Sequence, residues 1–239
     1  MTTEFAVPRP LLDPAAPMLT WHLSHPAAAR ERLLVGRQAI FTSAGHLSGY
    51  EVLFRSSHHA PLHVTHWSAA AQDGASAHVL RATFGSVGAS QVVGDRQAFI
   101  KVTRPYLVGD LPLPNEPDRL VVEVVPSVEA DPEVIAGVVA LRARGFRIAL
   151  DSFVGHAHQR RLLPFADYVK IDARDLDVEG EPLLTLARSH GAHLVAECIE
   201  SPIVELECQS LGFELLQGNG LAATRVLDLT ALALLERRR

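Results

Sequence analysis

The stretch that decides the fold is Gly145-Phe146-Arg147-Ile148-Ala149-Leu150-Asp151-Ser152-Phe153. Its apolar middle suits a buried parallel strand, and residues 131–144 before it are typical of a helix. Asp131 followed by Pro132 predicts the start of that helix, and Gly145 predicts its end. Asp151 therefore falls at the carboxyl end of a strand, where we expect it to line a pocket.

Three further apolar runs end on charged side chains in the same way. They are Leu120-Val-Val-Glu123, Tyr168-Val-Lys170-Ile-Asp172 and Leu194-Val-Ala-Glu197, and helix-like segments separate them. Strands that alternate with helices and carry polar residues at their carboxyl ends are typical of an α/β barrel. The site of such a barrel is expected at the face where these strands end.

An antiparallel pair is predicted at the start of this barrel. Two runs that favour β-structure, residues 38–41 and 47–54, flank a turn and indicate a β-hairpin. On its second strand Glu51, Leu53 and Arg55 alternate, so they share one face. An acid and an arginine on an inner face form an internal ion pair or bind a ligand, and both interpretations stay open here.

Length and composition favour one soluble domain. The 239 residues, 48% of them hydrophobic, suffice for one barrel with a sizeable core. We expect the barrel over residues 37–239 and, before it, residues 1–36 as a tail with a short helix that packs on the barrel. The formal charge of −5 provides no strong field for direct nucleic-acid or membrane binding. No membrane span or signal peptide is recognisable, and the two cysteines have no metal or redox spacing, so we expect a cytoplasmic protein.

The strand-end residues together indicate a metal-assisted site. Both lysines of the chain fall on predicted strands, although lysine normally lies on solvated faces. Several converging acids would repel one another unless they shared cations. Hard oxygen ligands suit Mg²⁺, Mn²⁺ or Ca²⁺, and a pair of such ions is the usual device for in-line phosphodiester cleavage. The residues are Glu51, Glu123, Asp151, Asp172, Glu197 and Glu200, with Lys101, Lys170, Arg55 and Gln217.

The order of the motifs resembles that of the EAL domain, a phosphodiesterase module for cyclic di-GMP in bacterial signal transduction. The resemblance covers about residues 37–223, and its fold implies a modified (β/α)8 TIM-like barrel with an antiparallel first strand. Within the family, Gln38-Ala-Ile-Phe41 and Asp151-Ser-Phe-Val154 are most similar to the divergent branch often joined to an HDOD domain. The motifs are Glu51-Val-Leu-Phe-Arg55, Val122-Glu123-Val124, Ala149-Leu-Asp151-Ser-Phe153, Val169-Lys170-Ile-Asp172, Val195-Ala-Glu197-Cys-Ile-Glu200 and Leu216-Gln217-Gly218.

The resemblance implies a role for each of these residues. The residues that match metal ligands are Glu51, Glu123, Asp151 and Glu197. The residues that match the catalytic set are Lys170, which helps to activate or orient the attacking water, Glu197 and Gln217. The residues that match the nucleotide site are Glu51, Leu53, Arg55 and Asp172. The implied cofactor is Mg²⁺ or Mn²⁺ if the domain is active, and none if it is not.

Two departures from the family pattern weaken the predicted metal sites. Lys101 stands where the family has a metal-ligating asparagine, and Ser152 stands where it has a second aspartate. An ammonium group that points into Glu51, Glu123 and Asp151 would replace the charge of the first metal and lower metal affinity. The alternative is that Lys101 turns outward or pairs with one acid only. Since the nucleophile of two-metal hydrolysis is a metal-bound water, we expect a degenerate domain that is weak or inactive as an enzyme.

Three functions therefore stay open on sequence alone. The first is a non-catalytic module that binds cyclic di-GMP and reports it to a partner. The second is a regulator that acts only through a protein partner. The third is a metal-dependent phosphodiesterase that cleaves cyclic di-GMP to linear pGpG. A homodimer is a further candidate, because family members often pair next to the loop that here reads Phe153-Val154-Gly155-His156.

Overall fold

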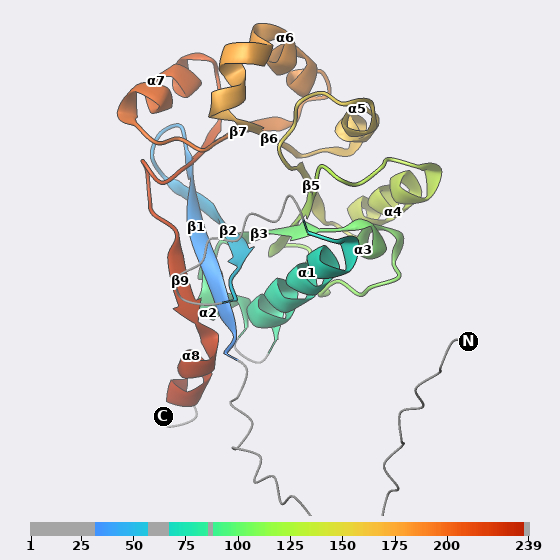
Figure 1. Ribbon diagram of the computed structural model, residues 1–239, viewed down its shortest axis with the longest axis vertical. Helices are drawn as coiled ribbons and strands as arrows, with labels where there is room; N and C mark the ends of the chain where they lie inside the picture. The colour runs from blue at the N-terminus through green and yellow to red at the C-terminus, as the bar shows by residue number, and fades with distance from the viewer. Residues whose placement is uncertain (1–31, 57–66, 86–87, 237–239) are drawn as a thin grey trace, which may run out of the picture. The chain divides into compact units, whose positions relative to one another are not determined.

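The computed structural model describes residues 32–56, 67–85 and 88–236 (Figure 1). Most of the predicted tail, residues 1–31, lies outside the described residues, so its helix and its packing stay predictions. The first strand, β1 (Leu34–Thr42), begins three residues before the expected barrel boundary at residue 37.

The described part of the chain forms a closed barrel of eight strands with a ninth strand at one edge. Strands β2 to β8 are parallel neighbours in chain order, and β1 closes the barrel by pairing antiparallel with both β2 and β8. This arrangement confirms the predicted modified (β/α)8 barrel with an antiparallel first strand. The remaining strands are β2 (Leu47–Phe54), β3 (Gln97–Val102), β4 (Leu120–Val124), β5 (Arg147–Leu150), β6 (Tyr168–Asp172), β7 (His193–Glu197), β8 (Leu215–Gln217) and β9 (Arg225–Asp228).

Strand β1 is longer than the sequence predicted because it pairs with three neighbouring strands. One edge pairs with β2 through the expected hairpin, whose turn contains Gly45 at a φ of +80°. The other edge is shared, since residues 40–42 pair with β8 and residues 34–37 pair with β9. Strand β9 was not predicted from the sequence, and it anchors the C-terminal helix beside the start of the barrel (Figure 1).

Helices lie outside the strands, as the alternating pattern predicted (Figure 1). The helix after β4 begins as expected, because the Asp131 side chain accepts hydrogen bonds from the backbone N–H groups of Glu133 and Val134. The short helix α5, which begins at Ala157, was not predicted from the sequence. The helices are α1 (Ala69–Phe84), α2 (Ala89–Val93), α3 (Arg104–Val108), α4 (Pro132–Ala143), α5 (Ala157–Leu162), α6 (Leu176–Arg188), α7 (Pro202–Ser210) and α8 (Leu229–Glu236).

Two apolar layers hold the barrel together. The larger one lies between strands and helices and includes Val122, Ile148, Leu194 and Phe213. The smaller one fills the interior of the barrel with side chains from seven strands. Its members are Ile40, Phe99, Val121, Ala149, Tyr168, Val195 and Leu215.

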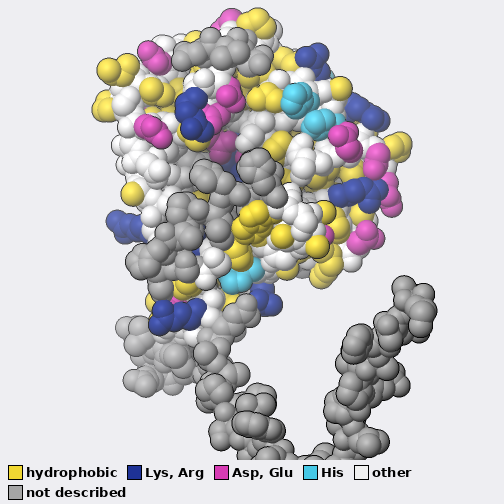
Figure 2. All heavy atoms as spheres, in the orientation of Figure 1, with side chains coloured by type: hydrophobic (Ala, Val, Ile, Leu, Met, Phe, Trp, Pro, Cys, Tyr) yellow, Lys and Arg dark blue, Asp and Glu magenta, His cyan; other side chains and the backbone are white. Residues whose placement is uncertain are grey.

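No helix of the described residues is both long enough and apolar enough to cross a bilayer. On the face shown in Figure 2, Lys and Arg side chains lie among Asp and Glu side chains.

Candidate functional site

The site is the polar layer that follows the inner apolar layer at the carboxyl ends of the strands. Side chains of a strand alternate between its two faces, so the residue two positions beyond each inner apolar residue also points inward. On antiparallel β1 the corresponding residue is Gln38, two positions before Ile40. Strand β2 contributes Glu51. The others are Lys101, Glu123, Asp151, Lys170, Glu197 and Gln217, each two residues after a member of the inner layer.

Lys170 occupies the centre of three carboxylates. Its ammonium nitrogen lies 2.8 Å from Glu123 Oε1, 2.8 Å from Glu197 Oε1 and 3.0 Å from Glu51 Oε2. The side chain is completely buried. Its N–H groups donate to Glu51 and Glu123, and its charge also pairs with Glu197. In this arrangement Lys170 is an internal counterion.

Lys101 occupies a second space between carboxylates. Its ammonium nitrogen lies 2.5 Å from Asp151 Oδ2, 3.1 Å from Glu123 Oε1 and 3.4 Å from Glu51 Oε1. The predicted orientation of Lys101 is thereby confirmed, and the alternative that it turns outward or pairs with one acid is wrong. Unlike Lys170, its side chain is 28% exposed, so it also faces the pocket beside the site.

The charges of this layer do not balance. The four carboxylates Glu51, Glu123, Asp151 and Glu197 face only two ammonium groups. Burial, and then the charge of Glu51, raise the pKa of Glu123 to about 8. Burial also opposes the charge on Glu51, but Lys170 and Lys101 outweigh it and hold the pKa of Glu51 well below its usual range. Burial therefore favours the protonated form of Glu123 over that of Glu51.

The same side chains fit divalent metal ions in type but not in arrangement. Carboxylate oxygens of Glu51, Glu123 and Glu197 lie within 4.8 Å of one another and would suit Mg²⁺ or Mn²⁺. The ammonium group of Lys170, however, contacts all three of these residues, and that of Lys101 contacts two of them and Asp151. Ser152 offers only a hydroxyl, which donates to Asp151 Oδ1 at 3.4 Å. A pair of divalent ions does not fit this site unless a lysine moves.

Gln217, which matches a catalytic residue of the family, is hydrogen-bonded to two side chains of the site. Its Nε2 donates to Glu51 Oε2 at 2.6 Å and to Gln38 Oε1 at 2.9 Å. Gln38 in turn donates to Asn219 Oδ1 at 3.1 Å. This chain of amides links the rim to the buried acids. Gln38 belongs to the site because it is two positions from Ile40 on β1, and that spacing could have identified it.

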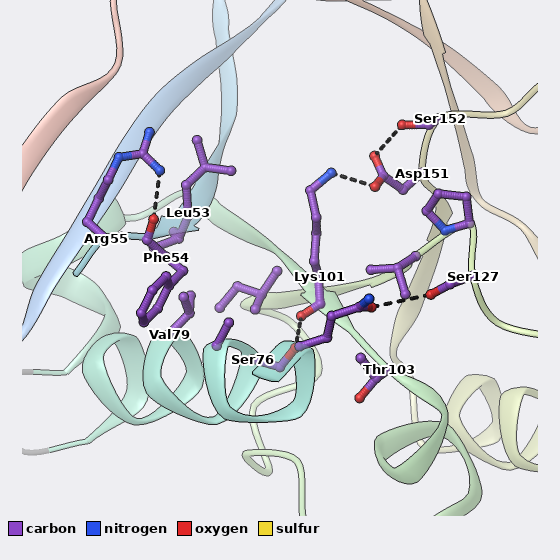
Figure 3. A pocket seen from close by; sticks show the side chains of 16 residues that line it. Leu53, Phe54, Arg55, Ser76, Val79, Lys101, Thr103, Ser127, Asp151 and Ser152 are labelled. Atoms are coloured by element: carbon purple, nitrogen blue, oxygen red, sulfur yellow. Dashed lines mark hydrogen bonds and ion pairs between the residues drawn. The ribbon is translucent and has the colours of Figure 1, made fainter. Parts of the chain in front are cut away.

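Arg55 and Leu53 lie at the edge of the polar layer, beside a pocket of about 280 Å³ (Figure 3). The internal ion pair considered for Glu51 and Arg55 does not form. Instead, the Arg55 guanidinium bends back and donates to the Phe54 carbonyl at 2.7 Å. Among the described residues no carboxylate forms a salt bridge with it, and partial burial lowers the pKa of Arg55.

Asp172, predicted as a nucleotide-site residue, is turned away from the buried acids. Its carboxylate accepts from the Arg174 backbone N–H at 2.9 Å and pairs with the Arg174 guanidinium at 2.5 Å. These contacts, against the opposing effect of burial, lower its pKa. The structure thus gives Asp172 a capping role at the short turn of residues 173–175, and its role toward a ligand stays a prediction.

The loop after Asp151 is held by Gln159, which no sequence motif identified. Gln159 is buried, accepts from the backbone N–H groups of Val154 and His156 at 3.1 Å each, and donates to the Ser152 carbonyl at 3.0 Å. Ser152 has a φ of +45°, a left-handed conformation that is unfavourable for serine. The clamp by Gln159 stabilises this turn and with it the direction of Asp151.

Comparison with known proteins relates this site to a family. The model of the EAL domain matches residues 27–224. The chain is 25% identical over 203 residues to the uncharacterized protein YuxH of Bacillus subtilis (strain 168), covering 82% of this chain and 48% of YuxH. It is 29% identical over 189 residues to the cyclic di-GMP phosphodiesterase CdgJ of Vibrio cholerae serotype O1, covering 77% of this chain and 42% of CdgJ. The chain thus spans less than half the length of either relative.

The fold is also similar to solved structures. One is the YkuI protein of Bacillus subtilis, with an EAL domain, in complex with cyclic di-GMP and calcium. The TM-score is 0.61 at 20% identity, and the match covers 86% of this chain and 61% of that one. The barrel topology, the ring of strand-end acids and the family match agree, and the chain belongs to the EAL domain family.

Proposed function

We propose that this EAL domain binds cyclic di-GMP without hydrolysing it through a metal pair, and that it acts as a regulator. The observation that carries the proposal is the position of Lys101, whose ammonium group contacts Glu51, Glu123 and Asp151. A positive charge in this place competes with a divalent ion for the same ligands. Two unit charges about 4 Å apart interact with roughly 4 kcal/mol at an effective dielectric constant of about 20, so each charge of the ion meets a repulsion of this order.

The change at the second metal position also argues against hydrolysis through a metal pair. The hydroxyl of Ser152 is a neutral ligand where two-metal chemistry needs an acid, and the nucleophile of that chemistry is a water whose pKa the ions must lower. With both metal positions weakened, the two lysines provide the positive charge that the acids of the polar layer face.

The nucleotide side of the site supports binding. Arg55 is half-buried and, among the described residues, without a carboxylate partner, so an anionic ligand would compensate its charge. The relative CdgJ is named a cyclic di-GMP phosphodiesterase, and the YkuI structure contains cyclic di-GMP. We therefore take a cyclic dinucleotide as the ligand, with Leu53 and Arg55 in contact with it.

An active metal-dependent phosphodiesterase is the second candidate function. The approach of carboxylate oxygens from Glu51, Glu123 and Glu197 to within 4.8 Å of one another favours it. In that case Lys170, Glu197 and Gln217 would serve as the catalytic residues after Lys101 had moved aside.

The wider setting belongs to the proposal as well. We infer a cytoplasmic signalling role with a protein partner, and a homodimer as a candidate assembly. Gln38-Ala-Ile-Phe41 on β1 and Asp151-Ser-Phe-Val154 after β5 support a place in the branch of EAL domains that is often joined to an HDOD domain.

The deciding experiment is calorimetric titration with cyclic di-GMP in chelator, and then with Mg²⁺, Mn²⁺ or Ca²⁺, followed by chromatography of the nucleotide. Binding in chelator with the nucleotide intact is the expected result. Conversion to the linear dinucleotide in Mn²⁺ would establish the enzyme instead. No binding under any condition would contradict the nucleotide function and leave the protein partner.

A paired test addresses the role of Lys101. The double variant Lys101→Asn with Ser152→Asp should gain calorimetrically detectable Mn²⁺ binding, because it removes the competing charge and restores an acid. Ser152→Asp alone is the matched control and should gain much less. If the double variant gains no more than the control, Lys101 is not what excludes the ion.

A further inference from the structure

Helix α7 presents an apolar face that the barrel does not use. Its inner side is held by Cys208, which is buried, and by Val204, which packs against the core. On its outer side Ile203 is 69% exposed and Leu206 is 65% exposed, the largest exposed fractions among the large hydrophobic side chains of the described residues. The helix lies on the outside of the barrel (Figure 1). The apolar surface of these two side chains is therefore available to a partner.

The spacing on this face suits another helix. Ile203, Leu206 and Ser210 are three and four positions apart, so they form one stripe along α7. Ser210 is exposed and small, and its hydroxyl already donates to the Glu207 carbonyl at 2.8 Å, so it needs no polar group from outside. Two helices that pack along a common seam have this spacing. With nine residues α7 offers about two and a half turns, and so a small contact of the kind found in transient complexes.

The surroundings of this α7 stripe are acidic. Residues 199–224 contain four glutamates and neither lysine nor arginine. Glu207 is exposed one turn after Ile203, and Glu205 accepts from the neutral amide of Gln209 at 3.2 Å. Neither glutamate forms a salt bridge within the described part of the chain. These charges favour a partner with lysine or arginine beside its apolar stripe, and they disfavour an anionic membrane or nucleic acid.

A second copy of the chain fits this face poorly. A two-fold pairing would set the α7 stripe against itself, so the glutamates of one copy would face those of the other. Like charges that face each other across an interface oppose association. A different protein with basic side chains removes this repulsion and adds ion pairs, so the occupant that the charges favour is a basic helix.

We propose that the α7 stripe binds an amphipathic helix of a partner protein. The apolar residues of that helix pack on Ile203 and Leu206, and its lysine or arginine side chains pair with Glu207. The residues of α7 do not line the pocket beside the polar layer. The proposal rests on the regulatory role proposed above, for which it names the surface and the chemistry of the protein partner, and it does not require cyclic di-GMP to bind.

Fluorescence anisotropy with a synthetic helix tests the charge of the partner. The probe carries leucine at the a and d positions of its heptads and lysine at the flanking e and g positions, and a matched peptide carries glutamate in place of lysine. The lysine peptide should bind wild-type protein at least about tenfold more tightly than the glutamate peptide, and sodium chloride should weaken its binding. Failure of the lysine peptide to bind, or equal affinity for the two peptides, would overturn the proposal.

A pair of protein variants locates the contact. The double variant Ile203→Ser with Leu206→Ser should bind the lysine peptide at least about tenfold more weakly than wild type, because it removes the apolar stripe. Val139→Ser is the matched control, since Val139 is 45% exposed on α4, and it should keep the wild-type affinity. Equal affinities of wild type and the double variant would overturn the α7 stripe.

Sedimentation and nucleotide titration separate this proposal from its alternatives. Wild-type protein should sediment as the same species as the double variant. A wild-type dimer that the double variant abolishes would assign the stripe to a second copy and overturn the proposal. The double variant should also keep the cyclic di-GMP affinity of wild type, so loss of peptide binding alone supports the stripe, and failure of wild type to bind the nucleotide would count against the nucleotide function only.

Discussion

The two lysines of the polar layer differ in their access to solvent. Lys170 is completely buried and bound on three sides, so it acts as a fixed part of the core. Lys101 is 28% exposed and borders the pocket beside the site. A ligand can therefore reach Lys101 and not Lys170. We therefore expect substitutions beside the pocket to change ligand binding, and substitutions of the buried acids to change how stability depends on pH.

The Arg55 guanidinium packs closely against Gly36. A Cβ atom at this residue would lie 2.8 Å from Arg55 Cζ, so the guanidinium would have to shift. Gly36→Ala should leave the melting temperature nearly unchanged, since a flexible side chain can move, yet weaken cyclic di-GMP binding about tenfold. Calorimetry and thermal unfolding measure the two effects. Unchanged affinity would show that Arg55 does not hold the phosphate from this position.

Glu123 should make stability fall as pH rises. Burial raises its pKa from 4.5 to about 8 in the folded protein, so between these values the folded state holds a proton that the unfolded chain has lost. The free energy of unfolding therefore decreases from about pH 4.5 to about pH 8. Glutamine mimics the protonated acid and does not titrate. Glu123→Gln should match wild type near pH 5 and lose most of this slope in urea unfolding.

The matched control for this prediction is Glu129→Gln, since the Glu129 side chain is 80% exposed. It should keep the pH slope of the wild-type protein. A Glu123→Gln variant with the full slope would assign the excess proton of the layer to another carboxyl group.

At the scale of elements, side chains of α5 and α1 hold the backbone beside two of the site residues. The helix α5 supplies Gln159, whose amide holds three backbone groups of the loop after β5. The helix α1 supplies Ser76, whose hydroxyl donates to the Lys101 carbonyl at 2.8 Å. The loops at the barrel rim are thus shaped by side chains of the following or neighbouring helix.

Replacement of Gln159 by leucine should destabilise the domain. The variant leaves the N–H groups of Val154 and His156 and the carbonyl of Ser152 without their partner, at a cost of about 1–3 kcal/mol in the free energy of unfolding. Arg161→Leu on the exposed side of α5 is the control and should stay within about 0.5 kcal/mol of wild type. Urea unfolding measures both, and equal stabilities would contradict the clamp.

At the scale of the whole molecule, the C-terminal strand β9 pairs with β1, the first strand of the barrel. Strand β1 pairs with β2, β8 and β9, and the backbone N–H of Leu229 donates to the Leu33 carbonyl at 2.9 Å. Leu229 is completely buried at the start of α8. The barrel therefore depends on residues that are almost 200 positions apart in the chain, such as Leu33 and Thr230, which are joined by a hydrogen bond.

Leu229→Ala should lower the free energy of unfolding by about 2–5 kcal/mol, the usual loss for a large side chain removed from a core. Leu206→Ala on α7 is the matched control, because Leu206 is 65% exposed and its removal leaves no cavity. Similar unfolding curves for the two variants would mean that α8 does not stabilise the barrel.

Much of the barrel could be predicted because its signals are local. Apolar runs that end on acids, a hairpin at the start and Asp131 as a helix cap depend on short periods and on single residues. Helix α5 and strand β9 were missed because a side-chain clamp defines the first and pairing with distant β1 defines the second.

The sequence by itself determined that most of the strand-end acids and both lysines gather at the rim, because alternation along a strand sends every second residue inward and the parallel strands β2 to β8 end on one face. Only the tertiary structure decided how they pair. It placed the Lys101 ammonium among Glu51, Glu123 and Asp151, left Arg55 without a carboxylate among the described residues and opened the pocket beside α1. The physical reason is distance: ion pairs and cavities depend on separations of a few ångströms between strands and helices far apart in the chain, which no local pattern encodes.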